Sequence, residues 1–245
     1  MRLTILGMNG PFPAPGGATS GYFLQAGENR IALDLGSGCL SRLTALTPPE
    51  DLTALLLTHW HYDHCADVLP LIYRLEACAA QPLHIYAPAD ESSLVRKAVQ
   101  SCQKIVLHDV APGETFRVGD AQVTAWLARH PVPAVMYRIQ AEGRTFCCTG
   151  DTNTVEGLTD FARGADLLLA DGLFTDATWR EGPVPAEGKP HLSARHVAQL
   201  AKDADVPRFV ITHLNPTIDP ETLLREARAV RTDALLARAG DSYEV

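Results

Sequence analysis

The stretch Thr58-His59-Trp60-His61-Tyr62-Asp63-His64 places three imidazoles and a carboxylate within six residues. It follows an apolar run at 52–57 and precedes the segment 66–71. A short Leu-rich run bounded by polar residues is typical of a buried strand. We therefore expect the heptapeptide to form a loop at the carboxyl end of that strand, where open α/β sheets bind their ligands. Imidazole nitrogens with a carboxylate oxygen are ligands that zinc prefers, which favours a metal site over a histidine-rich polar loop.

The composition is that of a globular protein with a full core. Of the 245 residues, 46% are hydrophobic and 20% are charged, which is the usual balance for a soluble domain. No apolar run approaches the roughly 18 residues of a membrane span, and the apolar part of the N-terminus is too short for a signal peptide. We therefore expect a single cytoplasmic domain over residues 1–245, with no membrane partner.

Charge and cysteine content narrow the classes of site. The formal net charge is −8, and no run is rich in Lys or Arg. A protein that grips many phosphates of a long nucleic acid usually carries a basic stripe, so a small substrate is favoured over RNA. The six cysteines show no C-x-x-C spacing, which argues against a zinc knuckle or a thioredoxin motif. Cys65, Trp60 and Tyr62, in or next to the heptapeptide, are expected to pack in the core.

Apolar runs separated by turn residues predict strands in both halves of the chain. They are expected at 3–6, 22–26, 30–34, 52–57, 84–87, 105–108, 114–118, 121–128, 135–139, 145–149, 165–170 and 208–212. Helices are expected at 39–46, 67–80 and 91–102, and two more after the start signals Ser193 and Asp219. Strands clustered in each half with helices following predict an α/β fold, a four-layer αββα sandwich of two mixed β-sheets with outer helices.

Three further metal-type residues follow predicted strands. His130 comes after the strand 121–128, Asp151 after 145–149, and His213 after 208–212. One rim of a sheet sandwich would gather residues that share this placement. Each alone is more often an ordinary polar residue, but together with the heptapeptide they predict a dinuclear metal site.

These residues carry a family resemblance. The heptapeptide matches the H-x-H-x-D-H signature of metallo-β-lactamase-fold hydrolases, and His130, Asp151 and His213 match the later ligands of that superfamily in order. The match covers nearly the whole chain. Segments 130–134, 149–152 and 191–194 are most similar to the ribonuclease Z-like branch, which also contains small bacterial phosphodiesterases.

The resemblance implies a role for each of these positions. His59, His61 and His130 would hold one Zn²⁺, Asp63, His64 and His213 would hold a second, and Asp151 would bridge the two. Mn²⁺ or Fe²⁺ are the alternative ions. Two such ions can share a hydroxide and draw charge from a phosphoryl oxygen during in-line attack. Asp63 would also orient or deprotonate the attacking water, and His191 would assist the departing oxygen.

Two departures from the tRNA-processing members favour a small phosphodiester, with a cyclic nucleotide as the best single candidate. The stretch 81–119 contains no Gly/Pro-rich basic arm, and the loop 9–19 contains no basic residue. The alternatives are a ribonuclease Z-type tRNA 3′-end endonuclease, and a lactone, thioester or sulfate-ester hydrolase. A non-catalytic relative that senses a metal or ligand is disfavoured, because every ligand position is filled.

Two surface expectations complete the interpretation. The longest connection, 175–190, is expected to cover the metal site, with Arg180 or Lys189 meeting substrate phosphate, because a loop of this length in a compact domain is usually functional or disordered. A solvated loop without ligand contact is the alternative. The helix near residues 69–75 is a candidate surface for a homodimer.

Overall fold

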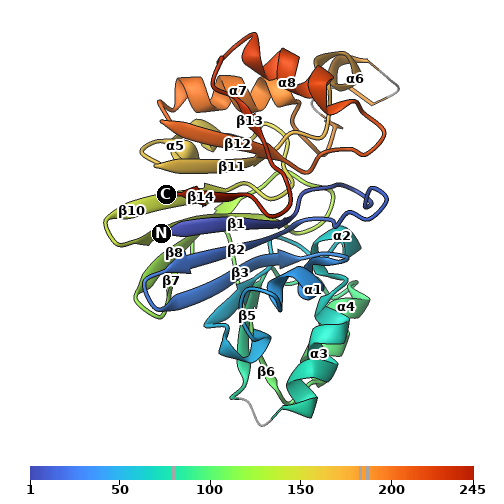
Figure 1. Cartoon of the computed structure of the whole chain (residues 1–245), viewed down its shortest axis with the longest axis vertical. Helices are drawn as coiled ribbons and strands as arrows, with labels where there is room; N and C mark the ends of the chain where they lie inside the picture. Colours follow the sequence, from blue (N-terminus) through green and yellow to red (C-terminus); the bar gives the residue numbers. More distant parts are fainter. Residues whose placement is uncertain (79–80, 182–183, 186–187) are drawn as a thin grey trace.

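The computed structural model describes residues 1–78, 81–181, 184–185 and 188–245. In this part of the chain two β-sheets face each other, and each is covered on its outer side by helices (Figure 1). The expected four-layer sandwich of two mixed sheets is therefore confirmed.

The first sheet has the strand order β14-β1-β2-β3-β4-β5-β6 among the described residues. Its strands are β1 (Arg2–Gly7), β2 (Gly21–Ala26), β3 (Asn29–Leu35), β4 (Ala54–Leu56), β5 (Leu83–Ala87), β6 (Ile105–Asp109) and β14 (Ser242–Glu244). From β3 to β6 all neighbours are parallel. The heptapeptide follows β4 and so lies at the edge where these parallel strands end.

The second sheet has the order β13-β12-β11-β10-β9-β8-β7 in the same part of the chain. Its strands are β7 (Thr115–Val118), β8 (Ala121–Leu127), β9 (Val135–Ala141), β10 (Arg144–Cys148), β11 (Leu167–Asp171), β12 (Arg208–Thr212) and β13 (Leu235–Leu236). Because β9 is antiparallel to both β8 and β10, while β10, β11 and β12 are parallel, β8, β10, β11 and β12 all end at one edge. That common edge is why residues far apart in the sequence meet in one site.

Helices form the two outer layers. They are α1 (Cys39–Leu43), α2 (Tyr62–Cys65), α3 (Val68–Ala77), α4 (Leu94–Ser101), α5 (Leu158–Ala162), α6 (Asp176–Arg180), α7 (Ala194–Asp203) and α8 (Pro220–Arg228). Helices α1, α3 and α4 lie on the first sheet, and α5, α7 and α8 lie on the second (Figure 1). Both predicted start signals are confirmed: Ser193 accepts a hydrogen bond from the His196 N–H, and Asp219 accepts one from the Glu221 N–H.

Three apolar cores separate the four layers. On β3, Ile31 and Leu33 face the second sheet, whereas Ala32 and Leu35 face the helices of the first layer. A strand buried on both faces needs apolar residues at successive positions. This is why β3 is a continuous apolar run from Ile31 to Leu33 without polar alternation.

Some element boundaries differ from the predictions. The second half of the heptapeptide forms the short helix α2, and α6 lies inside the segment expected to be a long loop. The helix predicted from residue 91 begins at Leu94, because Ser93 caps it by accepting a hydrogen bond from the Arg96 N–H. Residues 79–80 of a predicted helix lie outside the described residues.

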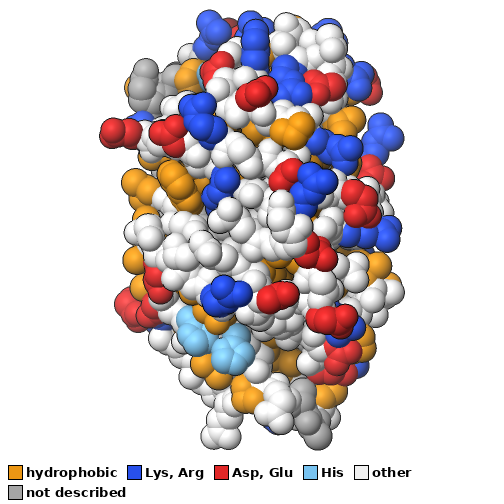
Figure 2. Space-filling view, turned by 90° about the vertical axis from the view of Figure 1, so that its left-hand side faces the viewer, with side chains coloured by type: hydrophobic (Ala, Val, Ile, Leu, Met, Phe, Trp, Pro, Cys, Tyr) orange, Lys and Arg blue, Asp and Glu red, His pale blue; other side chains and the backbone are white. Residues whose placement is uncertain are grey.

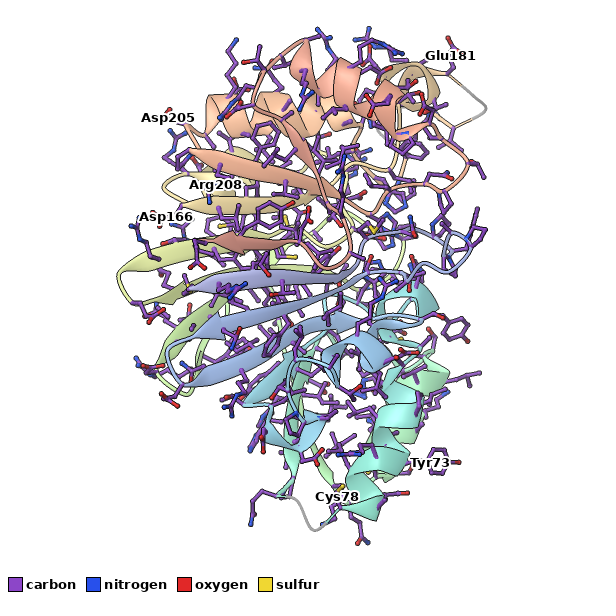
Figure 3. The ribbon with its side chains drawn as sticks, viewed as in Figure 1. Tyr73, Cys78, Asp166, Glu181, Asp205 and Arg208 are labelled. Atoms are coloured by element: carbon purple, nitrogen blue, oxygen red, sulfur yellow. The ribbon has the colours of Figure 1, made fainter. Side chains whose placement is uncertain are left out.

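The amino ends of the parallel strands lie at the edge opposite the metal-type residues. Asp166, before β11, and Arg208, at the start of β12, lie there (Figure 3). Figure 2 shows acidic and basic side chains interspersed over this face, with no continuous basic stripe. No helix in the described part of the chain is long and apolar enough to span a membrane.

The helix near residues 69–75, predicted as a candidate homodimer surface, corresponds to α3 and is partly exposed. Leu69 and Tyr73 are 42% and 75% exposed, and Tyr73 projects away from the body of the protein (Figure 3). Leu71 and Leu75 are instead buried in the core beneath the helix. Dimerisation through the helix near residues 69–75 stays a prediction.

Candidate metal centre

The loops at the common strand edge bring all seven predicted ligands together. Two groups of donor atoms, each with its atoms within 4.8 Å of one another, contain them. The first comprises His59, His61, His130 and Asp151, and the second comprises Asp63, His64, Asp151 and His213. Asp151 belongs to both groups, which is the position expected of a bridging carboxylate.

In the first group, His61 lies between the other two histidines. The His61 Nδ1 atom lies 3.0 Å from His59 Nε2 and 3.0 Å from His130 Nε2. Ligands at about 2.0–2.1 Å from a single ion have nitrogens separated by roughly this distance. Asp151 Oδ2 lies 3.8 Å from His59 Nε2 on the side of the second group.

The second group is built on two carboxylates. His213 Nε2 lies 3.1 Å from Asp63 Oδ2 and 3.3 Å from Asp151 Oδ2, and His64 Nε2 lies 3.2 Å from Asp151 Oδ1. His64 Nε2 and Asp151 Oδ1 are buried and make no hydrogen bond among the described residues. Buried polar atoms normally have a partner, so the second donor group fits a cation.

The electrostatics of the site agree with this fit. Burial lowers the pKa of His59 well below its usual value and that of His130 to about 4, so both imidazoles are neutral, the form that ligates metals. Burial also opposes charge on His213, but Asp151, Asp171 and Asp63 raise its pKa to about 10. The second position therefore favours positive charge, which a divalent cation can supply in place of a proton.

Asp34, which the sequence analysis did not single out, organises the first part of the site. This fully buried carboxylate lies 2.7 Å from His64 Nδ1 and accepts hydrogen bonds from the Thr58 N–H and hydroxyl. The Thr58 hydroxyl in turn lies 3.0 Å from His59 Nδ1. Such partners orient ligating imidazoles. A carboxylate at the end of the apolar strand β3 was the signal that could have revealed it.

Asp171 plays the same part for the later histidines and was also missed. It lies 2.8 Å from His191 Nδ1 and 3.5 Å from His213 Nδ1, and it is 1% exposed. His191 Nδ1 also lies 3.7 Å from Asp151 Oδ2, so the ring stands beside the predicted bridging carboxylate. With Nδ1 turned to Asp171, Nε2 is the nitrogen available to a bound molecule.

The loop after β1 approaches His213 closely. A Cβ built at Gly10 would lie 2.1 Å from His213 Nε2, nearer than any non-bonded atoms can come. Glycine at this position therefore leaves room for the imidazole. The Gly10 N–H also donates to the Leu214 carbonyl, which ties the loop to the end of β12.

The segment 175–190 reaches the site at its C-terminal end. His130 Nδ1 lies 3.2 Å from the Pro190 carbonyl oxygen, and the Trp179 indole N–H donates to the His191 carbonyl. The expectation for Lys189 is wrong, because its buried ammonium group donates to the Thr178 and Glu181 carbonyls. Arg180 forms an exposed ion pair with Asp176 at 3.1 Å, so its role toward substrate stays a prediction. Residues 182–183 and 186–187 lie outside the described part.

The aromatic residues between the ligands behave differently from each other. Trp60 is 3% exposed and donates its indole N–H to the Pro88 carbonyl, so its predicted packing role is confirmed. Tyr62 is 61% exposed, which contradicts the prediction that it packs in the core. The first turn of α2 turns its side chain to solvent beside His61. Cys65 is buried, as expected.

Comparison with known proteins identifies the family. The family described as Beta-lactamase superfamily domain matches residues 29–214. The chain is 28% identical to the probable metallo-hydrolase YhfI of Bacillus subtilis (strain 168), with 100% of both chains covered. It is 28% identical to a ribonuclease Z of Haloferax volcanii, covering 100% of this chain and 95% of the relative. The crystal structure of YhfI has a TM-score of 0.89 and 27% identity, covering 100% of this chain and 98% of that chain. Since the family match spans well over half of its residues, the chain belongs to the beta-lactamase superfamily.

Proposed function

We propose that the protein is a hydrolase that holds two zinc ions and cleaves a small phosphodiester, with a cyclic nucleotide as the first candidate. Mn²⁺ or Fe²⁺ are the alternative ions. The observation that carries the proposal is the pair of donor groups that share Asp151, with His191 beside them. Two relatives with similar sequences, named a probable metallo-hydrolase and a ribonuclease, support a hydrolytic reaction.

The ligands proposed for the first ion are His59, His61 and His130. Those for the second are Asp63, His64 and His213, and Asp151 would contact both. When bound there, two divalent cations would bring the pKa of a shared water toward neutrality and withdraw charge from a phosphoryl oxygen.

Asp63 is proposed to orient that water as well. Its contacts with His64 and His213 run through Oδ2, at 3.6 and 3.1 Å. Oδ1 is then the oxygen that can accept the water's hydrogen bond and take up its proton. With Oδ2 facing the histidines and Oδ1 facing the water, Asp63 could hold both in place at the same time.

His191 is proposed to assist the leaving group. The Asp171 carboxylate, at 2.8 Å from Nδ1, fixes the orientation of the ring and leaves Nε2 as the nitrogen that can face the departing oxygen. A proton or hydrogen bond delivered from Nε2 to the departing oxygen would stabilise it as the P–O bond breaks. The alternative is that His191 only begins the turn into α7.

The choice of a small substrate over tRNA rests on charge. The formal net charge is −8, and the buried Lys189 is bonded to backbone carbonyls at the edge of the site. The ribonuclease Z relatives keep tRNA 3′-end cleavage as the second candidate. Lactone, thioester or sulfate-ester hydrolysis is the third, because the same metal site could activate water against those bonds.

A parallel assay of zinc-loaded protein tests this ranking. Bis-p-nitrophenyl phosphate and 3′,5′-cyclic AMP are expected to be hydrolysed, and a precursor tRNA is expected to be cleaved poorly. Efficient cleavage of the tRNA without turnover of cyclic AMP would reverse the order. Hydrolysis of a lactone or thioester alone would place the third candidate first.

The variant Asp63→Ala tests the proposed metal-dependent mechanism. We expect it to reduce kcat by at least about 100-fold, because general-base positioning contributes roughly 10²–10⁴-fold. Asp160→Ala is the matched control, since Asp160 is a surface carboxylate with 70% side-chain exposure. Turnover retained in Asp63→Ala would refute the proposed mechanism.

A metal count provides a readout besides activity. The proposal predicts two ions per chain, and fewer in Asp151→Ala. His84 and His108 form a second, exposed pair of imidazoles 2.8 Å apart, and a histidine patch is visible in Figure 2. His84→Ala should leave the count unchanged, and a lower count in that variant alone would assign the metal to the surface.

A further inference from the structure

Two hollows open beside the first proposed metal position. The larger, of about 520 Å³, is called here the proline hollow, and it is lined by His130, Pro88, Pro112, Pro131 and Pro133 among others. The smaller, of about 230 Å³, is called the serine hollow, and it is lined by His61, Tyr62, Asp90, Ser92 and Ser93 among others. Val132 lines both, so the two hollows adjoin at this side chain, with His130 in one lining and His61 in the other. Together they are called the groove here.

The walls of this groove are preformed. Prolines have a fixed φ, so a wall built from four of them loses little conformational freedom when a ligand binds. The Pro88 carbonyl accepts the Trp60 indole N–H at 2.7 Å, which ties the wall to the metal loop. Val132 and the 61%-exposed Tyr62 line the same hollow. An exposed tyrosine ring next to an apolar side chain offers a stacking surface for a flat group.

Charge sets the kind of group that fits. Among the described residues that line the two hollows, none is a lysine or an arginine. Asp90 is the carboxylate in the lining, and its Oδ1 accepts hydrogen bonds from the Ser92 N–H and hydroxyl at 2.9 and 2.6 Å. A fixed negative charge repels a further phosphate. The groove therefore suits an uncharged ring and disfavours a second anionic group.

We propose that the groove binds a planar, uncharged ring carried by the phosphodiester, an aryl group or a nucleobase, which stacks on Tyr62 against Val132. The inference rests on the proposed phosphodiesterase function and names its substrate class. The phosphate would lie at the metal centre, and the ring would extend past His61 into the groove. Aromatic stacking of one base contributes roughly 10- to 100-fold to binding.

The test compares phenyl p-nitrophenyl phosphate with methyl p-nitrophenyl phosphate, which release the same p-nitrophenolate. In the zinc-loaded protein we expect kcat/KM for the phenyl ester to exceed that for the methyl ester by roughly 10- to 100-fold. Tyr62→Ala should reduce this ratio about 10-fold, and Tyr62→Phe should retain it because the ring remains. Tyr73→Ala is the matched control, since Tyr73 is an exposed tyrosine on α3, away from both hollows.

A binding measurement separates this inference from the proposed function. Phenylphosphonate should bind more tightly than methylphosphonate in calorimetry, and Tyr62→Ala should remove the difference. If phenylphosphonate binds more tightly in this Tyr62-dependent way but neither ester is hydrolysed, the ring site is supported and the phosphodiesterase function is refuted. Hydrolysis of both esters with the same ratio in wild type and Tyr62→Ala, together with equal phosphonate affinities, would overturn the ring site alone.

Discussion

At the scale of single residues, buried carboxylates control the geometry of the proposed metal centre. Asp34 bonds His64 and Thr58, and Asp171 bonds His191 and lies near His213. Neither belongs to the predicted ligand set, yet each holds an imidazole through Nδ1 and so leaves Nε2 for the site.

Asp34→Asn should weaken metal binding. The amide cannot accept from both Thr58 and His64 as the carboxylate does, and loss of such an orienting partner reduces metal affinity about 10- to 100-fold. Competition with a chromophoric chelator measures this. Asp166→Asn is the control: Asp166 also accepts from a backbone N–H, that of Thr145, and pairs with Arg144, but it lies at the opposite edge. Equal affinities in the two variants would contradict the role of Asp34.

His191→Ala should affect substrates according to their leaving group. For a phosphodiester with an alkyl leaving group, kcat should fall about 10²–10⁴-fold, because that oxygen needs a proton. For a p-nitrophenyl ester the fall should be much smaller, since p-nitrophenolate departs without one. A uniform loss for both substrates, or a loss of bound metal, would indicate a structural role only.

At the scale of elements, the described residues of the segment 175–190 link α6 to the metal loops. The segment begins with α6, and it returns through Lys189 and Pro190 to the metal loops. Thr175 caps α6 by accepting from the Thr178 N–H. Among the described residues of the segment, Pro190 contacts His130 and Trp179 contacts His191. The expectation that the segment covers the site stays a prediction.

Trp179→Phe should disturb catalysis while the fold remains. The variant loses the indole hydrogen bond to the His191 carbonyl but keeps an aromatic ring against His196, whose centroid is 4.1 Å away. One lost hydrogen bond costs about 0.5–1.5 kcal/mol, so kcat should fall roughly 2- to 12-fold. Deleting residues 179–187 tests the whole segment in the same way, through KM and kcat. Unchanged KM and kcat in both variants would show that the segment has no part in catalysis.

At the scale of the whole molecule, the two sheets are joined beneath the metal loops. Tyr137 on β9 donates its hydroxyl hydrogen bond to the Leu57 carbonyl at the end of β4, at 3.0 Å. The Val135 N–H donates to the Thr58 carbonyl, at the start of the heptapeptide. Ligands from both sheets therefore depend on one packed interface, and ions bound at the two groups should stabilise the entire sandwich.

Removing the metal should lower the melting temperature. An ion present at 100-fold its Kd stabilises the native state by about 2.7 kcal/mol, which corresponds to roughly 5–10 °C for a chain of this size. Calorimetry with and without a chelator measures the shift. Asp151→Ala, which lacks the carboxylate shared by both groups, should show little response to the chelator. A chelator-independent melting temperature in the wild type would refute metal binding by the folded protein.

Predictions from sequence were most accurate where one local rule decides the outcome. Continuous apolar runs predicted the buried strands, and the capping residues Ser193 and Asp219 predicted where two helices begin. The helix α6 was missed because none of its five residues is buried, so no apolar periodicity marks it. Asp34 and Asp171 were missed because a single carboxylate after a strand has many possible roles.

By itself, the sequence determined which side chains can ligate metal and which strands carry them, because ligand chemistry and apolar patterning are local properties. Only the tertiary structure decided that Asp34 and Asp171 contact the histidines of the site, that Lys189 bonds to backbone carbonyls, and that Tyr62 faces solvent. These depend on how two sheets pack and where their strand ends meet. Contacts between residues distant in the chain follow from that packing and leave no local pattern in the sequence.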